Sequence, residues 1–395
     1  MKESYFEPTP QTGAGGAPPE RALLVQVVHG RQTKAEGVES LAELERLADT
    51  AGVVVIGAVT QRRDRPTPKF YVGEGKLEDI QMACRQGGAN LVIFDNDLSP
   101  VQVNNIDLAL GIKVIDRTEL ILQIFARRAR SAEAQIQVEL AQLEYLVSRI
   151  PVSARQQRFQ GGIGMRGPGE SPFRLRNAPM RRRIKDLKEK LEHIRSRRST
   201  TRVKRPYPLV CLVGYTNAGK STLLNALADA DAYVDDRLFA TLDTKTRLVH
   251  LAPQYNVLLI DTVGFIRHLP HGLVASFRST LDVAREADLL LRVADASHPF
   301  VCDHIEISEQ TLETIEARQV PYIRVFNKAD LIADEKELDN LQKDWPDAMF
   351  VSARSGRGLA GLKDELCRRL IEQGAYAGRK VHPPAGFADG PWSKQ

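Results

Sequence analysis

Residues 214–221 have the types and spacing of a loop that binds phosphate groups. They match G-x-x-x-x-G-K-[ST] directly after the apolar stretch LVCLV, and they are Gly214, Tyr215, Thr216, Asn217, Ala218, Gly219, Lys220 and Ser221. The glycines let consecutive backbone N–H groups curl around phosphate oxygens, and a helix starting near Lys220 points the positive end of its dipole there. Lys220 supplies a cation for the β and γ phosphates, and the Ser221 hydroxyl is a ligand for Mg²⁺. The sequence therefore predicts a nucleoside triphosphate site with Mg²⁺ as cofactor.

A second loop predicts the identity of the base. The apolar stretch PYIRVF is followed by Asn327, Lys328, Ala329 and Asp330. The Asp330 carboxylate can accept hydrogen bonds from N1–H and the exocyclic amine of guanine, whereas adenine lacks this donor pair and would leave the carboxylate unpaired. Asn327 can orient the loop, and Lys328 can cover the ring with its aliphatic stem. Farther along, the stretch AMFV ends where a backbone N–H can meet guanine O6, in the run Ser352, Ala353 and Arg354. We expect the nucleotide to be GTP.

Two segments between these loops are candidates for sensing the γ-phosphate. LLIDTVGF places Asp261 at a strand end, where it can hold a water bound to Mg²⁺, and continues with Thr262, Val263 and Gly264. The N–H of Gly264 can contact the γ-phosphate. Upstream, DDRLFATLDTKTR offers threonines of which one must complete the metal coordination when GTP is bound, and we choose Thr241 over Thr244 and Thr246. The expected metal ligands are therefore Ser221 and Thr241, and the expected catalytic groups are Lys220, Thr241 and Gly264.

Length and composition describe an ordinary globular protein. The 395 residues suffice for two or three domains, and 43% hydrophobic and 27% charged residues fit neither a disordered nor a membrane protein. No uncharged apolar run reaches about 18 residues and the start MKESYFEPTP lacks the pattern of a signal peptide, so we expect a cytoplasmic protein. The four cysteines are spaced singly, which predicts buried thiols rather than a zinc site or disulfides.

The elements that position these loops belong to the α/β class of folds. Residues 1–20, rich in proline and glycine, predict a disordered tail. Residues 21–116 alternate short apolar runs such as ALLVQVV with amphipathic runs such as SLAELERLADTA, which predicts a small parallel α/β domain built from βαβ units. Residues 206–375 predict a P-loop GTPase domain with a doubly wound sheet, and residues 376–395 predict a second tail.

Residues 117–205 predict a basic antiparallel helical hairpin. A helical stretch beginning near Arg117 and a second stretch both carry apolar residues at spacings of three and four. The two seams are Ile136, Leu140, Leu143, Val147 and Ile150, and Ile184, Leu187, Leu191 and Ile194. The loop RFQGGIGMRGPGE between them combines flexible glycines with arginines that can bind phosphate, namely Gly161, Gly162, Gly164, Gly167, Gly169, Arg158 and Arg166.

Positive charge is concentrated in this hairpin. Residues 127–205 carry 21 Lys and Arg against 7 Asp and Glu, whereas the formal net charge of the whole chain is only +5. Too few acidic residues are present to pair with these cations inside the helices, so a nucleic acid is the expected partner. A solvated helical face without a partner, with a plain mobile connector at the tip, is the alternative.

The order of the motifs resembles a known family. GYTNAGKST, FATLD, DTVGF, NKAD and VSARSG resemble translation-factor-type GTPases, and YVGEGK, QVELAQLEYL and GGIGMRGPGE resemble, more specifically, the HflX family, over roughly residues 22–372. The resemblance implies binding of GTP and Mg²⁺, hydrolysis of GTP to GDP and phosphate, and association with the large ribosomal subunit and its rRNA through residues 127–205. Members of the family are linked to the splitting and rescue of stalled or idle ribosomes. The resemblance further implies a second switch from Asp261 to Gly264 and a first switch formed by Phe239, Ala240, Thr241, Leu242 and Asp243.

Some residues depart from related patterns. Phe265 stands where Ras-like proteins have a glutamine, so hydrolysis should be slow alone and accelerated by a partner, which we expect to be the ribosome. The segments PVSARQQRFQ and SPFRLRNAP differ from the usual pattern of the family, and Arg174 and Arg176 make the second of them more cationic. His268 and His271 are expected to be switch-surface or packing residues rather than catalytic groups.

Alternative functions are compatible with the same residues. A GTPase of ribosome assembly or RNA modification would bind precursor RNA, and a non-hydrolysing, GTP-gated RNA-binding module would agree with Phe265. The segment from Gly73 to Lys76 in YVGEGK predicts a tight turn opening a helix, with a second, ATP-binding site as the alternative. We expect a monomer that binds GTP or GDP and does not insert into a membrane.

Overall fold

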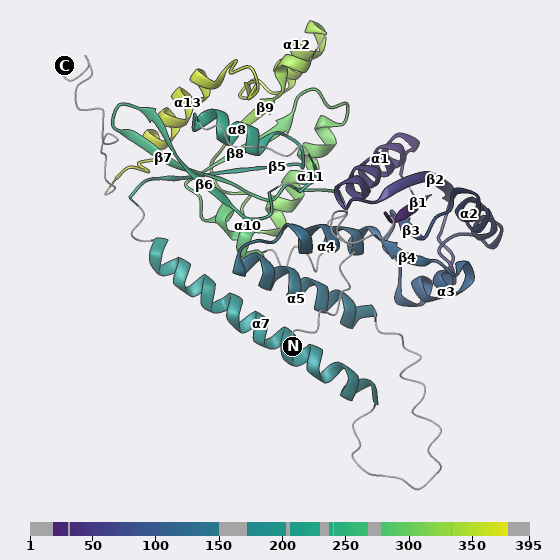
Figure 1. The fold of residues 1–395 in the computed structure, drawn as a ribbon. Coiled ribbons are helices and arrows are strands. Elements are labelled where there is room, and N and C mark those ends of the chain that lie inside the picture. The colour runs from purple at the N-terminus through teal and green to yellow at the C-terminus, as the bar shows by residue number, and fades with distance from the viewer. Residues whose placement is uncertain are drawn as a thin grey trace. The chain divides into compact units, whose positions relative to one another are not determined.

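A computed structural model of the chain describes residues 19–30, 32–149, 172–202, 206–229, 237–239, 241–267, 278–332 and 334–377 (Figure 1). These residues form two compact units. One contains the residues up to Arg127 together with Gln135–Glu189, and the other contains Arg128–Ala134 together with the residues from Lys190 onward. The two predicted tails lie outside the described residues except for their inner two positions each. Within the described ranges, no helix has the length and apolar character that a bilayer crossing needs.

The N-terminal unit is built on a four-stranded sheet. Its strands are β1 (Arg21–His29), β2 (Val54–Arg63), β3 (Leu91–Phe94) and β4 (Lys113–Asp116). They lie in the order β2-β1-β3-β4, and every neighbouring pair is parallel. Parallel strands need crossover connections, which the amphipathic stretches between them provide as helices. The predicted small parallel α/β fold is therefore confirmed.

Local capping residues set where these helices begin. The helices are α1 (Lys34–Thr50), α2 (Glu74–Gly87), α3 (Pro100–Leu110) and α4 (Arg117–Arg128). Thr33 caps α1 and Ser99 caps α3, each in a reciprocal capping box with the residue three positions on. Gly73 directly precedes α2, so the segment YVGEGK opens a helix, as the turn interpretation predicts.

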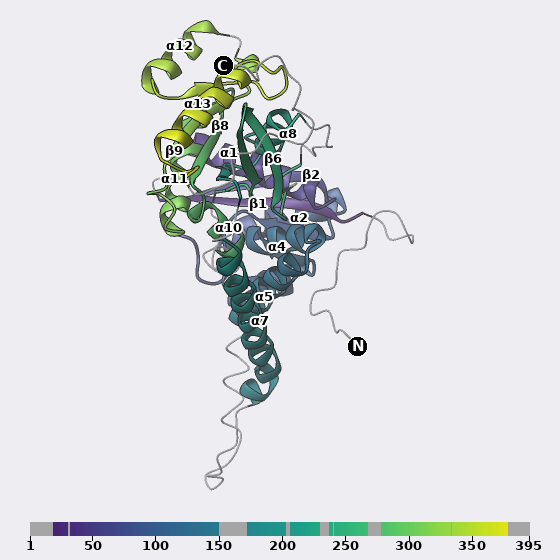
Figure 2. The same cartoon turned by 90° about the vertical axis from the view of Figure 1, so that its left-hand side faces the viewer.

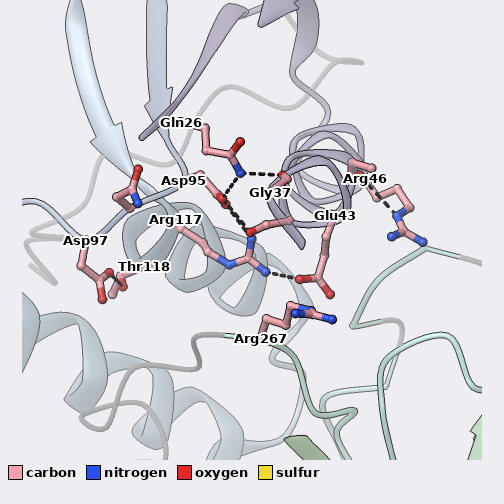
Figure 3. A network of polar contacts seen from close by, with 12 residues as sticks. Gln26, Gly37, Glu43, Arg46, Asp95, Asp97, Arg117, Thr118 and Arg267 are labelled. Carbon is pink, nitrogen blue, oxygen red and sulfur yellow. Dashed lines mark hydrogen bonds and ion pairs between the residues drawn. The ribbon is translucent and has the colours of Figure 1, made fainter. Parts of the chain in front are cut away.

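A buried network of polar side chains joins α1, β3 and α4 in this unit (Figure 3). The Asp95 carboxylate accepts hydrogen bonds from Ser40 Oγ at 2.6 Å, Gln26 Nε2 at 3.0 Å and Arg117 at 2.8 Å. Arg117 also pairs with Glu43. Burial alone would raise the pKa of Asp95, but the Arg117 guanidinium and the hydrogen bonds from Ser40 and Gln26 hold it below its ordinary value. The network thus keeps buried charges paired.

A second polar cluster holds the end of helix α5 (Ala132–Arg149) within the same unit. The Tyr145 hydroxyl donates to Asp116 at 2.9 Å and to Glu119 at 3.2 Å, and Arg149 pairs with Asp116. Burial and the nearby Asp116 carboxylate raise the pKa of Glu119 to about 7. Glu119 is therefore a half-buried acid with a pKa near neutrality.

Helices α5 and α7 (Pro172–Arg202) form the predicted helical pair and lie side by side (Figures 1 and 2). The Glu139 carboxylate accepts hydrogen bonds from Nε and Nη2 of Arg183 at 2.6 and 2.8 Å, and Glu144 pairs with Lys188 at 2.8 Å. The glycine-rich tip predicted at residues 158–169, together with Ile150, lies outside the described residues. Arg174 and Arg176 are described only as part of the helical backbone of α7.

The helical stretch expected to start near Arg117 is interrupted. Helix α4 ends at Arg128 and α5 starts at Ala132, so residues 129–131 form a break. The physical reason is a cap, because Ser131 Oγ accepts the Ala134 N–H at 3.1 Å and starts a new helix.

The second unit is built on a six-stranded sheet in the order β10-β9-β8-β5-β7-β6. Its strands are β5 (Leu209–Gly214), β6 (Lys245–Ala252), β7 (Tyr255–Asp261), β8 (Leu289–Asp295), β9 (Tyr322–Asn327) and β10 (Met349–Phe350). Only the β6–β7 pair is antiparallel. Its helices are α8 (Lys220–Leu227), α10 (Arg278–Arg285), α11 (Val301–Thr314), α12 (Glu335–Asp344) and α13 (Leu359–Glu372), with a 3₁₀ turn at Ala329–Leu331.

Side chains of β5 alternate between two hydrophobic cores. Val210 and Leu212 pack in the core that contains α8 and α13, whereas Leu209 and Cys211 pack in the core that contains α10 and α11. Helices therefore cover both faces of the sheet, as expected for a doubly wound fold. Of the four free cysteines, Cys302 is exposed and the others are buried, so the prediction of buried thiols is wrong for Cys302.

Candidate nucleotide-binding site

The loop between β5 and α8 depends on two close backbone approaches. At Gly214, which has φ 149°, an added Cβ would lie 2.1 Å from the Val293 carbonyl oxygen. At Gly219, which has φ 84°, an added Cβ would lie 2.3 Å from Asn327 Nδ2. Larger residues cannot occupy either position without moving the neighbouring strand or loop. The two glycines are required by packing as well as by the phosphate chemistry expected of them.

Lys220 lies inside this loop. Its ammonium group donates to the carbonyl oxygens of Gly214 at 3.1 Å and Tyr215 at 2.8 Å, and the residue is 6% exposed. Burial lowers the pKa of Lys220 to about 8, against the opposing effect of the Asp261 carboxylate. A phosphate group would add negative charge beside this amine and favour its protonated form.

Three oxygen-bearing side chains meet beside Lys220. Ser221 Oγ donates to Asp261 Oδ2 at 2.5 Å and lies 2.8 Å from Thr241 Oγ1. Asp261 is fully buried, and its other oxygen, Oδ1, accepts no hydrogen bond from the described residues. Burial raises the pKa of Asp261, with Lys220 and Ser221 acting in the opposite direction. Two hydroxyls and a buried carboxylate with one unsatisfied oxygen form the hard donor set that suits Mg²⁺.

The segment after Asp261 is attached to the phosphate loop by backbone hydrogen bonds. Phe265 N donates to Gly214 O at 3.0 Å, and Thr216 N donates to Phe265 O at 2.7 Å. A Cβ at Gly264 would lie 2.8 Å from Thr216 Cα and 2.9 Å from Lys220 Nζ, so this position faces the loop directly. The Phe265 ring is buried in the core. Its side chain therefore cannot orient a water at the site.

The neighbouring side chains hold the same segment in place. Thr262 Oγ1 donates to Leu212 O at 2.7 Å, and the Tyr215 hydroxyl accepts the Arg267 N–H at 2.9 Å. The Tyr215 ring stacks on His304, with centroids 3.8 Å apart and planes 4° apart. His268 and His271 lie outside the described residues.

The predicted first switch is described at four of its five positions. Thr241 reaches the Ser221 hydroxyl, Phe239 and Leu242 are buried, and Ala240 lies outside the described residues. Asp243 directs its carboxylate to the backbone of Arg130 and Ser131 rather than toward the phosphate loop. Its side chain therefore engages the turn before α5.

One asparagine connects the three loops expected to surround the nucleotide. Asn327 Nδ2 donates to Ala218 O at 3.0 Å, and Ala353 N donates to Asn327 Oδ1 at 3.0 Å. Asp330 is exposed and forms no hydrogen bond with any residue in the described part of the chain. Its carboxylate is available to a ligand. Arg354 is exposed, and Ser352 Oγ accepts the Ser355 N–H at 3.0 Å.

Two contributors to this arrangement were not anticipated from the sequence. Asp295, at the end of β8, accepts a hydrogen bond from the Lys328 ammonium group at 2.7 Å. This bond holds the side chain of Lys328, whose backbone has a left-handed φ of 62°. Ser131 joins the first-switch segment to the start of α5. An aspartate at the end of an apolar strand was a usable signal for Asp295, whereas no local pattern indicated the partner of Ser131.

Comparisons with known proteins agree with this geometry. Family models match consecutive parts of the chain, namely GTP-binding GTPase N-terminal at residues 38–126, GTP-binding GTPase Middle Region at 128–205, and 50S ribosome-binding GTPase at 209–328. The GTPase HflX of Escherichia coli K12 is 42% identical over 93% of this chain and 87% of its own length. The GTPase HflX of Caldanaerobacter subterraneus subsp. tengcongensis is 44% identical over 90% of this chain and 81% of its own length. A crystal structure of SsGBP in complex with GDP is 27% identical, covers 89% of this chain and 99% of that chain, and gives a TM-score of 0.50.

Proposed function

Since this chain belongs to the HflX family of GTPases, we propose that it couples GTP binding and hydrolysis to association with the large ribosomal subunit, in the splitting or rescue of ribosomes. The observation that carries the proposal is the convergence of Lys220, the Ser221, Thr241 and Asp261 oxygens, and the Asn327 loop at the carboxyl ends of adjacent strands. In a doubly wound sheet this edge is where ligands bind.

Each group has a defined task in the proposed reaction. The phosphate-loop amides and Lys220 bind the β and γ phosphates, and the Gly264 N–H donates to a γ-phosphate oxygen. Ser221 and Thr241 would hold Mg²⁺, and Asp261 would hold a water of that ion. Mg²⁺ would neutralise charge that develops on the phosphate oxygens. Asp330 accepts N1–H and the exocyclic amine of guanine, and a backbone N–H of the Ser352–Arg354 loop donates to O6.

The same arrangement predicts weak activity in isolation. The buried Phe265 leaves the position directly after Gly264 without a side chain that could orient the attacking water. Lys220 would bind the β and γ phosphates and Ser221 and Thr241 would hold Mg²⁺, but none of these groups positions the attacking water. A partner that orders both switches would therefore accelerate turnover.

The expected partner surface is basic helix α7. Arg181, Arg182, Lys185 and Lys190 are exposed on it. Exposed arginines and lysines along one helix bind phosphate groups with an affinity that falls steeply with salt. The large subunit, whose surface is largely RNA, supplies such phosphates.

The test is steady-state GTP turnover with and without purified large subunits. We expect stimulation by about tenfold or more, and no turnover in the Lys220→Ala variant because it loses nucleotide binding. Stimulation by precursor particles but not mature subunits would assign the protein to assembly instead. GTP binding without any turnover under either condition would exclude the enzymatic function.

The RNA contact is tested with a charge-reversed variant. Arg181→Glu with Arg182→Glu should weaken subunit binding and reduce the slope of log K against log salt by about 2. Lys336→Glu with Lys343→Glu, on α12, makes the same charge change on another exposed helix and serves as the control. Equal losses in both variants would contradict a specific role for α7.

A further inference from the structure

The Asp243 carboxylate closes the turn that precedes α5. It accepts the N–H groups of Arg130 at 3.0 Å and Ser131 at 3.2 Å, and it also accepts the Ser131 hydroxyl. Ser131 Oγ in turn accepts the Ala134 N–H at 3.1 Å. Residues 128–134 belong to the same compact unit as Asp243. The first turn of α5 is thus capped jointly by Ser131 and by a residue more than a hundred positions away.

Asp243 is also tied to the nucleotide site on both sides along the chain. Two residues before it, Thr241 lies 2.8 Å from Ser221, and Leu242 between them is only 3% exposed. Two residues after it, Lys245 is the register partner of Asp261 in the β6–β7 pair. Two residues of extended chain span only about 7 Å. Because this link is short, a shift of Thr241 away from Ser221 that exceeds its slack must also move Asp243, whose hydrogen bonds to the turn require close contact.

We propose that Asp243 is a positioning residue through which GTP and Mg²⁺ fix the start of α5, a proposal that rests on the GTPase function stated above. When Thr241 is drawn to the metal, Asp243 caps the helix, and when Thr241 leaves, the cap is lost. Helix α5 carries the Glu139 and Glu144 carboxylates that pair with basic helix α7. The state of the nucleotide is thereby communicated to the helical pair that we expect to contact RNA.

Such coupling is reciprocal. If a GTP-bound first switch stabilises the start of α5, then a capped α5 must favour GTP over GDP by the same factor. A purely structural cap would stabilise the helix equally in both nucleotide states. This difference separates the proposal from a static role.

The test uses the full chain with Mg²⁺ and either GDP or a non-hydrolysable GTP analogue. Amide exchange of residues 132–140 and nucleotide affinity by calorimetry are measured for the wild type, Ser131→Ala, Asp243→Ala and Asp243→Asn. In the wild type the analogue should slow exchange by about fivefold relative to GDP. Asp243→Ala should remove that difference and weaken analogue binding, relative to GDP, by about fivefold. Ser131→Ala loses the hydroxyl contacts but keeps the two backbone bonds to Asp243, so it should reduce both effects. Asp243→Asn, which retains an acceptor oxygen, should restore part of both effects.

The matched control is Ser99→Ala, which removes a serine cap from α3. It should leave the nucleotide dependence at α5 unchanged. Nucleotide binding with equal exchange in both states of the wild type, or a difference that persists undiminished in Asp243→Ala, would overturn the coupling alone. Absence of binding by either nucleotide would overturn the proposed function, and the coupling with it.

Discussion

Asn327 provides a quantitative test of how the nucleotide loops are held together. In Asn327→Ala, Ala218 O and Ala353 N–H both lose their partner at a position that is 2% exposed. Each buried group left without a hydrogen bond costs about 1–3 kcal/mol, so the total for the two groups is about 2–6 kcal/mol. Because the lost bonds join the phosphate loop to both base loops, a large part of this cost should appear as lost affinity. A loss of about 2 kcal/mol corresponds to roughly a 30-fold weaker affinity for GDP.

The assay is GDP calorimetry combined with thermal unfolding. The matched control is Asn256→Ala, which removes another buried asparagine, one that bonds to His250. Asn256 lies near the start of β7, five residues from Asp261 and thus about 16 Å from it. The control should lower the melting temperature while GDP affinity stays within about twofold. Asn327→Ala with wild-type GDP affinity, or equal losses of affinity in both variants, would refute the reasoning.

Three further predictions concern the switch and the N-terminal unit. Gly264→Ala places a Cβ within 2.9 Å of Lys220 Nζ and should lower the rate of single-turnover hydrolysis by about tenfold. GDP affinity should change by less than about threefold, because GDP lacks the γ-phosphate. An unchanged hydrolysis rate would contradict the role assigned to Gly264. Arg117→Met leaves Asp95 and Glu43 buried without their cation and should destabilise the N-terminal unit by about 3–5 kcal/mol in urea unfolding, whereas a loss under about 1 kcal/mol would show that water replaces the guanidinium. Glu119 has a folded pKa of about 7, above its unfolded value, so the wild type loses stability as pH rises through 7. Glu119→Gln should remove that loss, so the variant is more stable than the wild type at pH 8 and no more stable at pH 5, and parallel pH profiles would disprove the assignment.

The backbone of the loop between β5 and α8 is predictable from the sequence because its close approaches demand particular residue types. A glycine that must clear the Val293 carbonyl, or a lysine at the start of a helix, leaves a local trace in the chain. The parallel sheets are predictable for a similar reason, since buried strands and amphipathic helices have different hydrophobic periods. The roles of the individual site residues stay predictions until they are measured.

What the sequence did not reveal depends on contacts between distant residues. The pairing of Lys328 with Asp295 and of Ser131 with Asp243 follows from strand order and chain reversal, which no short window encodes. The break before α5 is different. Ser131 followed by an acidic residue at Glu133 is an ordinary start signal for a helix, and the regular apolar spacing obscured it.

The first and last residues of the NKAD segment differ in burial and in their contacts with the rest of the protein. Asn327 faces inward and its amide is committed to the scaffold, whereas Asp330 faces solvent and its carboxylate is committed to nothing within the described chain. Within these four residues, the expected selectivity for guanine and the stability of the loops therefore depend on different side chains. We therefore expect substitution at position 330 to alter which base is accepted while the protein stays folded, and substitution at position 327 to weaken binding of every guanine nucleotide alike. A related protein with a different residue at position 330 would therefore be expected to prefer another base while keeping the same phosphate loop.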